Sequence, residues 1–221
     1  RGCRFCVVKS EARPPSPSAD EPIKLADTLA DMRLEYAVLT TVCRDDLPDQ
    51  GASHLAACIR AVKTKCPSMK LEILAQDFRG DKNLLEQVIA AGPDVFAHNI
   101  ECVARLTAGV RDARAGYKQS LEVLAHAKWF QGGLPTKSSL MLGLGETEEE
   151  LMQALRDLRS VGCDIVTLGQ YLRPSGQGRH LPVTSFVTPE DFNRYGRHAR
   201  ELGFLYVASG PFVRSSYRAA E

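Results

Sequence analysis

The chain has 221 residues, of which 44% are hydrophobic and 25% charged, and its formal net charge at pH 7 is +1. This composition is typical of a globular protein long enough to bury a core, and it excludes a disordered chain. Charges of both signs are spread along the sequence, which disfavours a nucleic-acid-binding surface, and the longest apolar runs are too short to span a membrane.

The chain opens with a pair of cysteines, Cys3 and Cys6, in the stretch RGCRFC. A zinc site would need a second pair of ligands, and a thioredoxin-like redox pair would need a strand before it and a helix directly after it. The other five cysteines are scattered, mostly in apolar segments, where a cysteine is usually a small buried hydrophobic residue. Because the total of seven is odd and small, we do not expect a disulfide scaffold.

The next stretch, residues 9–22 (KSEARPPSPSADEP), is rich in proline, serine and charge. This composition excludes a helix or a central strand. The stretch lies directly after the cysteine pair, so it is either a flexible tail or an ordered loop that covers a neighbouring site.

Beyond residue 22, short apolar runs rich in β-branched residues alternate with segments of helical period. Helix starts are marked by Asp81 as an N-cap, by the capping box of Thr147 and Glu150, and by Pro189 at a first helical position. The apolar runs predict buried parallel strands. They are YAVLTT (36–41), KLEILA (70–75), DVFAHN (94–99), KSSLMLG (137–143) and DIVTLG (164–169).

This alternation predicts a parallel sheet with helices outside it, as an open doubly wound sheet or as a barrel. A polar or glycine-rich stretch follows each predicted strand: CRDDLPDQG, QDFRGD, HNIE, GLGET and GQYLRPSG. Because barrel enzymes build their active sites at the carboxyl ends of the strands, this arrangement favours a barrel or partial barrel with a large polar site.

These blocks together resemble one family. RGCRFC is similar to the last part of the C-x-x-x-C-x-x-C signature of radical S-adenosylmethionine (SAM) enzymes. The collinear blocks that resemble lipoyl synthases are VKSEARPP, LTTVCRDDLPDQGASH, DFRGD, HNIE, TKSSLMLGLGE, LGQYLRPS and ASGPFVRSSY. They cover essentially the whole chain, and DFRGD, LGQY and RSSY are highly specific in combination.

The resemblance implies an α/β fold, the radical SAM partial (β/α)6 barrel that is similar to a TIM barrel. We expect this barrel over residues 1–208, with 9–22 as an irregular loop and with the first strand missing from the chain. Residues 209–221, which contain RSSY, are expected to form a C-terminal segment that closes on an auxiliary cluster.

The resemblance also implies the chemistry. Lipoyl synthases insert sulfur at carbons 6 and 8 of a protein-bound octanoyl-lysine and so form the lipoyl cofactor. Cys3 and Cys6 would be two of the three thiolates that hold the radical SAM [4Fe–4S] cluster, and the first thiolate belongs two positions upstream of Arg1. We therefore expect the chain as it stands to be an inactive fragment. No side chain is expected to act as an acid or base catalyst, because the cofactors carry the difficult step.

Further site residues follow from the same resemblance. Phe5 lies where the family has an aromatic ring beside the adenine of SAM, although a simple loop anchor is an alternative. Asn99, Glu101 and Lys137 are placed to contact SAM, although structural hydrogen bonds explain them equally well. The remaining candidates are Gly143 and Gly145, which let the backbone approach a ligand closely.

The auxiliary cluster would be a second [4Fe–4S] cluster, consumed as the sulfur donor. The resemblance implies that Ser216 is its ligand, with Ser215 as the runner-up. An oxygen ligand leaves iron more easily than a thiolate does, which suits a cluster that is consumed. Asp45, Asp46 and Asp49 are left out of the site because they could equally cap a helix, and His98 and His180 are interpreted as core or surface histidines.

The partners implied are an octanoylated carrier, either H protein or the lipoyl-carrying acyltransferase of a 2-oxoacid dehydrogenase, and an electron donor such as ferredoxin or flavodoxin. Neither nucleic acid nor a membrane is expected. The family implies a mitochondrial or plastid location, or otherwise the bacterial cytoplasm. Two alternatives stay open: another sulfur-inserting radical SAM enzyme, or a truncated barrel that is not an enzyme.

Overall fold

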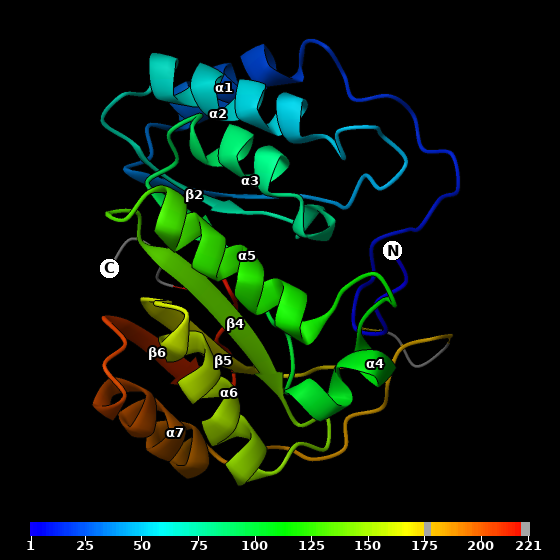
Figure 1. Cartoon of the computed structure of the whole chain (residues 1–221), viewed down its shortest axis with the longest axis vertical. Coiled ribbons are helices and arrows are strands. Elements are labelled where there is room, and N and C mark those ends of the chain that lie inside the picture. Colours follow the sequence, from blue (N-terminus) through cyan, green and yellow to red (C-terminus); the bar gives the residue numbers. More distant parts are fainter. Residues whose placement is uncertain (175–177, 218–221) are drawn as a thin grey trace.

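Six parallel strands form one sheet in this computed structural model, which describes residues 1–174 and 178–217. The strands are Tyr36–Thr40 (β1), Lys70–Leu74 (β2), Val95–Ala97 (β3), Thr136–Leu142 (β4), Ile165–Gln170 (β5) and Tyr206–Gly210 (β6). They lie side by side in chain order. Within the described ranges β1 and β6 are not paired, so the sheet is an open, partial barrel with helices along it (Figure 1). The α/β partial barrel expected from the sequence is confirmed.

The helices begin where the capping residues predict. Asp81 accepts hydrogen bonds from the Asn83 and Leu84 amides, and Thr147 and Glu150 form the expected capping box. Pro189 is the first residue of its helix. The helices are α1 (Glu21–Met32), α2 (Ala52–Lys65), α3 (Lys82–Ile89), α4 (Thr107–Val110), α5 (Tyr117–Phe130), α6 (Glu148–Ser160) and α7 (Pro189–Glu201), with short 3-10 turns η1 (Phe78–Gly80) and η2 (Ala104–Leu106). In the described part of the chain no helix has the length and apolar character needed to cross a membrane.

The five predicted strands are confirmed with ends shifted by up to two residues, but the sequence analysis does not predict β6. Its sequence, YVASG, contains small residues where a strand normally carries β-branched ones, and Ser209 donates a hydrogen bond to the Phe192 carbonyl of α7. The boundary expected between residues 208 and 209 therefore falls inside a strand. Residues 218–221 of the expected C-terminal segment lie outside the described residues.

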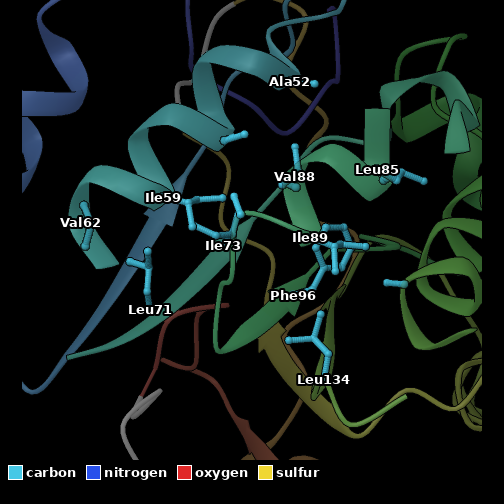
Figure 2. Packing of buried hydrophobic residues seen from close by; sticks show 14 of the residues in the cluster. Ala52, Ile59, Val62, Leu71, Ile73, Leu85, Val88, Ile89, Phe96 and Leu134 are labelled. Atoms are coloured by element: carbon cyan, nitrogen blue, oxygen red, sulfur yellow. The ribbon is translucent and has the colours of Figure 1, made fainter. Parts of the chain in front are cut away.

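Side chains alternate across the sheet, and the outer set forms the core. Leu71 and Ile73 of β2 pack with α2 and α3, as Figure 2 shows from close by. The labelled partners include Ile59, Val62, Val88 and Ile89, all fully buried. Burying one such side chain contributes about 1.5–3 kcal/mol, so this layer supplies much of the stability of the first half of the sheet.

The inner set includes a buried polar triad. Between Leu71 and Ile73, Glu72 faces the opposite way and accepts hydrogen bonds from Lys137 Nζ at 2.9 Å and from the Tyr36 hydroxyl at 2.7 Å. The side chains of Lys137 and Glu72 are 3% and 1% exposed. Burial, and then the neighbouring Glu72 carboxylate, raise the pKa of Tyr36, so the phenol stays protonated and continues to donate.

We expect Lys137→Met to destabilise the fold strongly, because it leaves the Glu72 carboxylate buried without a counter-ion. Loss of one partner of a buried pair costs about 3–5 kcal/mol. Replacing both residues, as in Glu72→Leu with Lys137→Met, should cost less than the single change. Urea denaturation of the three proteins measures the difference, and equal losses would show that the charge pairing is unimportant.

Candidate functional site

A cavity of about 890 Å³ lies at the carboxyl ends of β1, β2 and β3. One wall is the N-terminal cysteine loop, and the other walls are the segments that follow these strands. Five predicted site residues line it together, although they come from opposite ends of a 100-residue span. They are Cys3, Phe5, Cys6, Asn99 and Glu101. The polar site expected at the carboxyl ends of the strands is therefore present in the first half of the sheet.

The cysteine loop is held by backbone hydrogen bonds. The Arg4 amide donates to the Val110 carbonyl at 2.8 Å, and the Cys6 amide donates to the Cys3 carbonyl at 3.2 Å. The Asp112 amide donates to Cys3 Sγ at 3.3 Å. Both cysteines are free and half-buried. Burial raises the pKa of the Cys3 thiol, and the hydrogen bond from Asp112 acts in the opposite direction.

Two further segments enclose the loop. Residues 8–12 and Pro14 line the cavity, and Ser10 donates to the Arg1 carbonyl at 2.6 Å. The structure thus favours the covering loop over the flexible tail for the start of 9–22. From the other side, the Leu181 amide donates to the Arg4 carbonyl, and His180 Nε2 lies 3.0 Å from the Cys6 carbonyl. His180 therefore supports the cysteine loop instead of being a plain surface histidine.

The segment after β3 brings carboxylate and amide oxygens to the cavity. Asn99 Nδ2 donates to Glu101 Oε1 at 3.2 Å, and Asn99 Oδ1 is buried with no hydrogen-bond partner in the described part of the chain. Glu101 has a φ of 68°, an unusual conformation for a residue with a Cβ, and burial raises the pKa of its carboxyl group. Gln76 Oε1 is likewise buried without a partner. Such unsatisfied acceptors fit a ligand that brings hydroxyl or amino donors.

Arg111, which the sequence analysis missed, supplies a cation to the same cavity. Its guanidinium is buried, and Nη1 donates to the Ser120 hydroxyl at 2.8 Å and to the Ile100 carbonyl at 3.3 Å. Nε has no partner within residues 1–174 and 178–217. Among the described residues Arg111 forms no ion pair. The only signal in the sequence is an arginine that follows the polar strand end HNIE by ten residues, a separation too long for a local motif to reveal.

Arg111 is oriented by a short hydrogen-bond chain. His98 Nδ1 lies 2.9 Å from the Ala75 carbonyl, which only accepts, so Nδ1 carries the proton and donates. His98 Nε2, at 2.9 Å from Ser120 Oγ, then accepts from the serine hydroxyl, whose oxygen accepts from Arg111. Burial, followed by the charge of Arg111, lowers the pKa of His98 to about 4, so the imidazole is neutral near pH 7. The interpretation of His98 as a core histidine is therefore incomplete.

Three other predicted residues lie away from the cavity lining. Lys137 is engaged by Glu72 inside the sheet. Gly143 and Gly145 have φ values of 94° and 104°, and a Cβ on Gly143 would lie 2.3 Å from the Ser185 carbonyl oxygen. Gly143 therefore lets the backbone at Ser185 approach the end of β4 closely, whereas a Cβ on Gly145 would make only ordinary contact with Thr184.

Ser215 and Ser216 lie in a turn that follows β6, and neither lines the cavity of Cys3 and Cys6. The turn is closed by the Tyr217 amide, which donates to the Arg214 carbonyl at 2.9 Å. Its flanks, Phe212, Val213 and Tyr217, line a second cavity of about 530 Å³ beside β6. Within the described ranges no group of three histidine, cysteine or acidic residues could hold a metal ion.

Comparison with known proteins places the chain in a family. The model of the Radical SAM superfamily matches residues 1–158. A lipoyl synthase of Thermus thermophilus is 56% identical over 219 residues, which are 99% of this chain and 67% of that protein. The chain belongs to the radical SAM superfamily and, within it, to the lipoyl synthases. The family expected from the sequence is thus confirmed.

Organellar lipoyl synthases are similarly close. The chloroplastic lipoyl synthase 1 of Zea mays is 54% identical over 221 residues, and the mitochondrial lipoyl synthase of Leishmania braziliensis is 54% identical over 222 residues; each match covers 100% of this chain. The chain spans 61% and 58% of the length of these two proteins. Lipoyl synthases of bacterial, chloroplast and mitochondrial origin are therefore all near relatives.

Solved structures agree on the fold. A crystal structure of methylornithine synthase has a TM-score of 0.70 at 16% identity, over 99% of this chain and 72% of that one. A maturase of the [FeFe]-hydrogenase has a TM-score of 0.64 at 14% identity, over 96% of this chain and 54% of that one. At this identity the likeness supports the partial barrel and nothing about the reaction.

The backbone just before the RSSY turn packs directly against Gly169 of β5. A Cβ on Gly169 would lie 2.1 Å from the Val213 carbonyl oxygen. We expect Gly169→Ala to displace the 213–217 turn and to speed tryptic cleavage after Arg214 about tenfold or more, because backbone must move to relieve the clash. Gly133→Ala, where a Cβ meets nothing within 4 Å, is the control. Unchanged cleavage in both variants would contradict this view of the turn.

Proposed function

We propose that this chain forms the catalytic barrel of a lipoyl synthase, which inserts sulfur at carbons 6 and 8 of a protein-bound octanoyl-lysine. The observation that carries the proposal is the single cavity in which a free cysteine pair faces unsatisfied polar groups on the ends of the first strands. The lipoyl synthase relatives, which match nearly the whole chain at more than 50% identity, agree with it.

The donor set fits the cofactors of the family in part. Cys3 and Cys6 would supply two thiolates to a [4Fe–4S] cluster, and three cysteine ligands leave one iron free for SAM. When bound, the cluster and SAM supply the one-electron chemistry that breaks an unactivated C–H bond. The residues around them hold the ligands in place and keep water away from the reacting carbon.

The other residues of the cavity have binding roles in this proposal. Arg111, which forms no ion pair with any residue that the structure describes, would pair with the carboxylate of SAM through a charge-assisted hydrogen bond. Asn99 Oδ1 and the Glu101 carboxyl group would accept hydrogen bonds from the ribose or the amino group. Phe5 would pack beside the adenine. Lys137, Gly143 and Gly145 do not line this cavity, and their contact with SAM stays a prediction.

An auxiliary [4Fe–4S] cluster, with Ser216 or Ser215 as a ligand, belongs to the proposal as well. Support comes from the resemblance of RSSY to the family; the flanks of the C-terminal turn, and not the two serines, line a cavity separate from that of the cysteine pair. An octanoylated H protein or 2-oxoacid dehydrogenase acyltransferase would be the substrate, and ferredoxin or flavodoxin the electron donor. We propose a mitochondrial or plastid location, with the bacterial cytoplasm as the alternative.

The cysteine pair provides the first test. In the full-length protein, Cys3→Ala or Cys6→Ala should abolish reductive cleavage of SAM and lipoyl formation, while about half of the iron remains on the auxiliary cluster. Iron per chain, 5′-deoxyadenosine and lipoyl product measure this outcome. Cys58→Ala, a buried cysteine on α2, is the matched control and should retain all three. Wild-type iron in Cys6→Ala would end the cluster assignment.

The Arg111 arrangement provides the second test. Arg111→Gln should weaken SAM binding to the reconstituted full-length protein about 10- to 100-fold, the range expected for a hydrogen bond between charged groups. Ser120→Ala should weaken it about three- to tenfold, because the guanidinium keeps its charge but loses the support of the His98 chain. Ser209→Ala removes a serine hydrogen bond beside α7 and is the control. Equal affinity in Arg111→Gln and wild type would reject this role.

A third outcome separates the alternatives. SAM cleavage without lipoyl product, in a protein with both clusters and an octanoylated carrier present, would favour another sulfur-inserting radical SAM enzyme. An upstream coding sequence without a cysteine two residues before Arg1 would favour the truncated barrel that is not an enzyme.

A further inference from the structure

The DFRGD block, residues 77–81, has no role in the proposed chemistry, yet its conformation is unusual. Phe78 and Arg79 have φ values of 45° and 50°, followed by Gly80 at 75°. Two consecutive residues with a Cβ in the left-handed region are unfavourable and persist only where the surroundings impose them. Phe78 is 1% exposed and anchors the turn in the core. The strained turn therefore fixes the two aspartates at its ends.

The two aspartates make different contacts. Asp81 caps α3. Asp77 accepts the Arg79 amide through Oδ1 at 3.0 Å, and its fully buried carboxylate pairs with Arg1 of the cysteine loop, with Nη1 at 2.7 Å from Oδ2. Burial by itself would raise the pKa of Asp77, but the hydrogen bond and charge of Arg1 outweigh it and lower the pKa below its usual range.

A second carboxylate completes the contact with Arg1. Arg1 Nε and Nη2 donate to the two oxygens of Asp45, after β1, at 2.8 and 2.9 Å. The hydrogen bond from Arg1 is the largest cause that lowers the pKa of Asp45 to about 2. Arg79, the residue next to the strained position, also donates from Nε to Asp45 at 3.1 Å. Such bidentate pairing fixes the direction of a guanidinium as well as its position.

Arg1 also lines the cavity, but its charge is already paired with carboxylates of the protein. Its side chain is 6% exposed, and its Nε, Nη1 and Nη2 atoms all donate to carboxylates. Arg111, in the same cavity, is buried and forms no ion pair among the described residues, although its charge acts on the nearby Glu101 carboxyl group. One arginine is thus neutralised by two acids of the protein, and the other is left for an anion.

We propose that Asp45 and Asp77 hold the cysteine loop in place through Arg1, so that Arg1 is a positioning residue for Cys3 and Cys6. The contact of Arg1 with the two aspartates lies two residues before Cys3 in the chain. On its other side the Gly2 amide donates to Asp112 Oδ2 at 2.6 Å, and the Arg4 amide donates to Val110. Segments that follow β1, β2 and β3 therefore hold the loop from both sides. We call the contact of Arg1 with Asp45 and Asp77 the clamp. Its relevance to a cluster rests on the proposed function, whereas its effect on the order of the loop does not.

The test compares Asp77→Asn, Asp45→Asn and Arg1→Gln with wild type in the metal-free, full-length protein. Amide hydrogen exchange of residues 2–6 and the rate at which iodoacetamide alkylates Cys3 report the order of the loop. Both rates should rise about tenfold or more in Asp77→Asn, since a hydrogen bond between charged groups is lost there. Arg1→Gln leaves the 77–81 turn intact, so it serves even where Asp77→Asn does not fold.

Asp164→Asn is the matched control. Asp164 is similarly buried and accepts from Lys128 Nζ at 2.6 Å and from the Thr136 amide at 2.8 Å, at the opposite ends of the strands. It should lower the global stability without changing exchange at residues 2–6. Two outcomes would contradict the positioning role of Arg1. One is that the control accelerates exchange of the loop as much as Asp77→Asn does, and the other is that neither Asp77→Asn nor Arg1→Gln accelerates it.

Reconstituted protein gives an independent readout. Iron should be lost to a chelator about tenfold faster from Asp77→Asn and Arg1→Gln than from wild type or Asp164→Asn, and equal rates in all four would overturn the positioning role. A wild-type protein that takes up no cluster, while its variants still show the faster loop exchange, would reject the proposed function and keep the clamp.

Discussion

The strict alternation of side chains along six parallel strands is the constraint on which the rest of the structure depends. Each strand sends every second residue into the helical layer, which is filled with aliphatic side chains. The remaining residues face the interior of an open barrel, where apolar groups alone would stay partly wet. That interior carries the Tyr36–Glu72–Lys137 triad and the hydrogen bond between Thr167 and Ser139. Internally paired polar groups let the inner face stay polar without being a binding site along its whole length.

At the carboxyl ends of the strands this pairing is incomplete, and there the molecule can bind something. Asn99 Oδ1, Gln76 Oε1 and Arg111 Nε are all buried without partners. Among the described residues Gln50 Oε1 and Arg159 Nε also lack partners, but they lie outside this cavity, so it is the gathering of three such atoms in one cavity that fits a ligand. The same region holds two arginines in opposite electrostatic states. Arg1 is neutralised by acids and belongs to the scaffold, whereas Arg111 keeps its charge available.

Much of this architecture follows from local sequence signals. The capping residues Asp81 and Thr147 and the β-branched runs identify elements because their physics involves neighbours in the chain. The sequence analysis missed β6 because YVASG is stabilised by contacts with β5 and α7, which no local pattern records. In the site, Cys3, Phe5 and Asn99 were predictable from the family resemblance. Arg111 and Ser120 were not, since their roles arise from hydrogen bonds to His98 and Ile100 across the fold. Lys137 looked like a strand-end ligand but faces a carboxylate two strands away.

The segment from Val8 to Pro14 gives the cavity one wall without secondary structure, whereas the opposite walls continue from strand ends. The contacts described between this wall and the rest of the site are few: Ser10 donates to the Arg1 carbonyl and lies 3.4 Å from Arg179. Displacing it breaks no hydrogen bond between strands. Local opening of this wall would therefore cost less free energy than opening of the sheet, because few described hydrogen bonds tie the wall to the site. Substitutions in this proline-rich segment would then change the free energy of local opening more than the stability of the sheet.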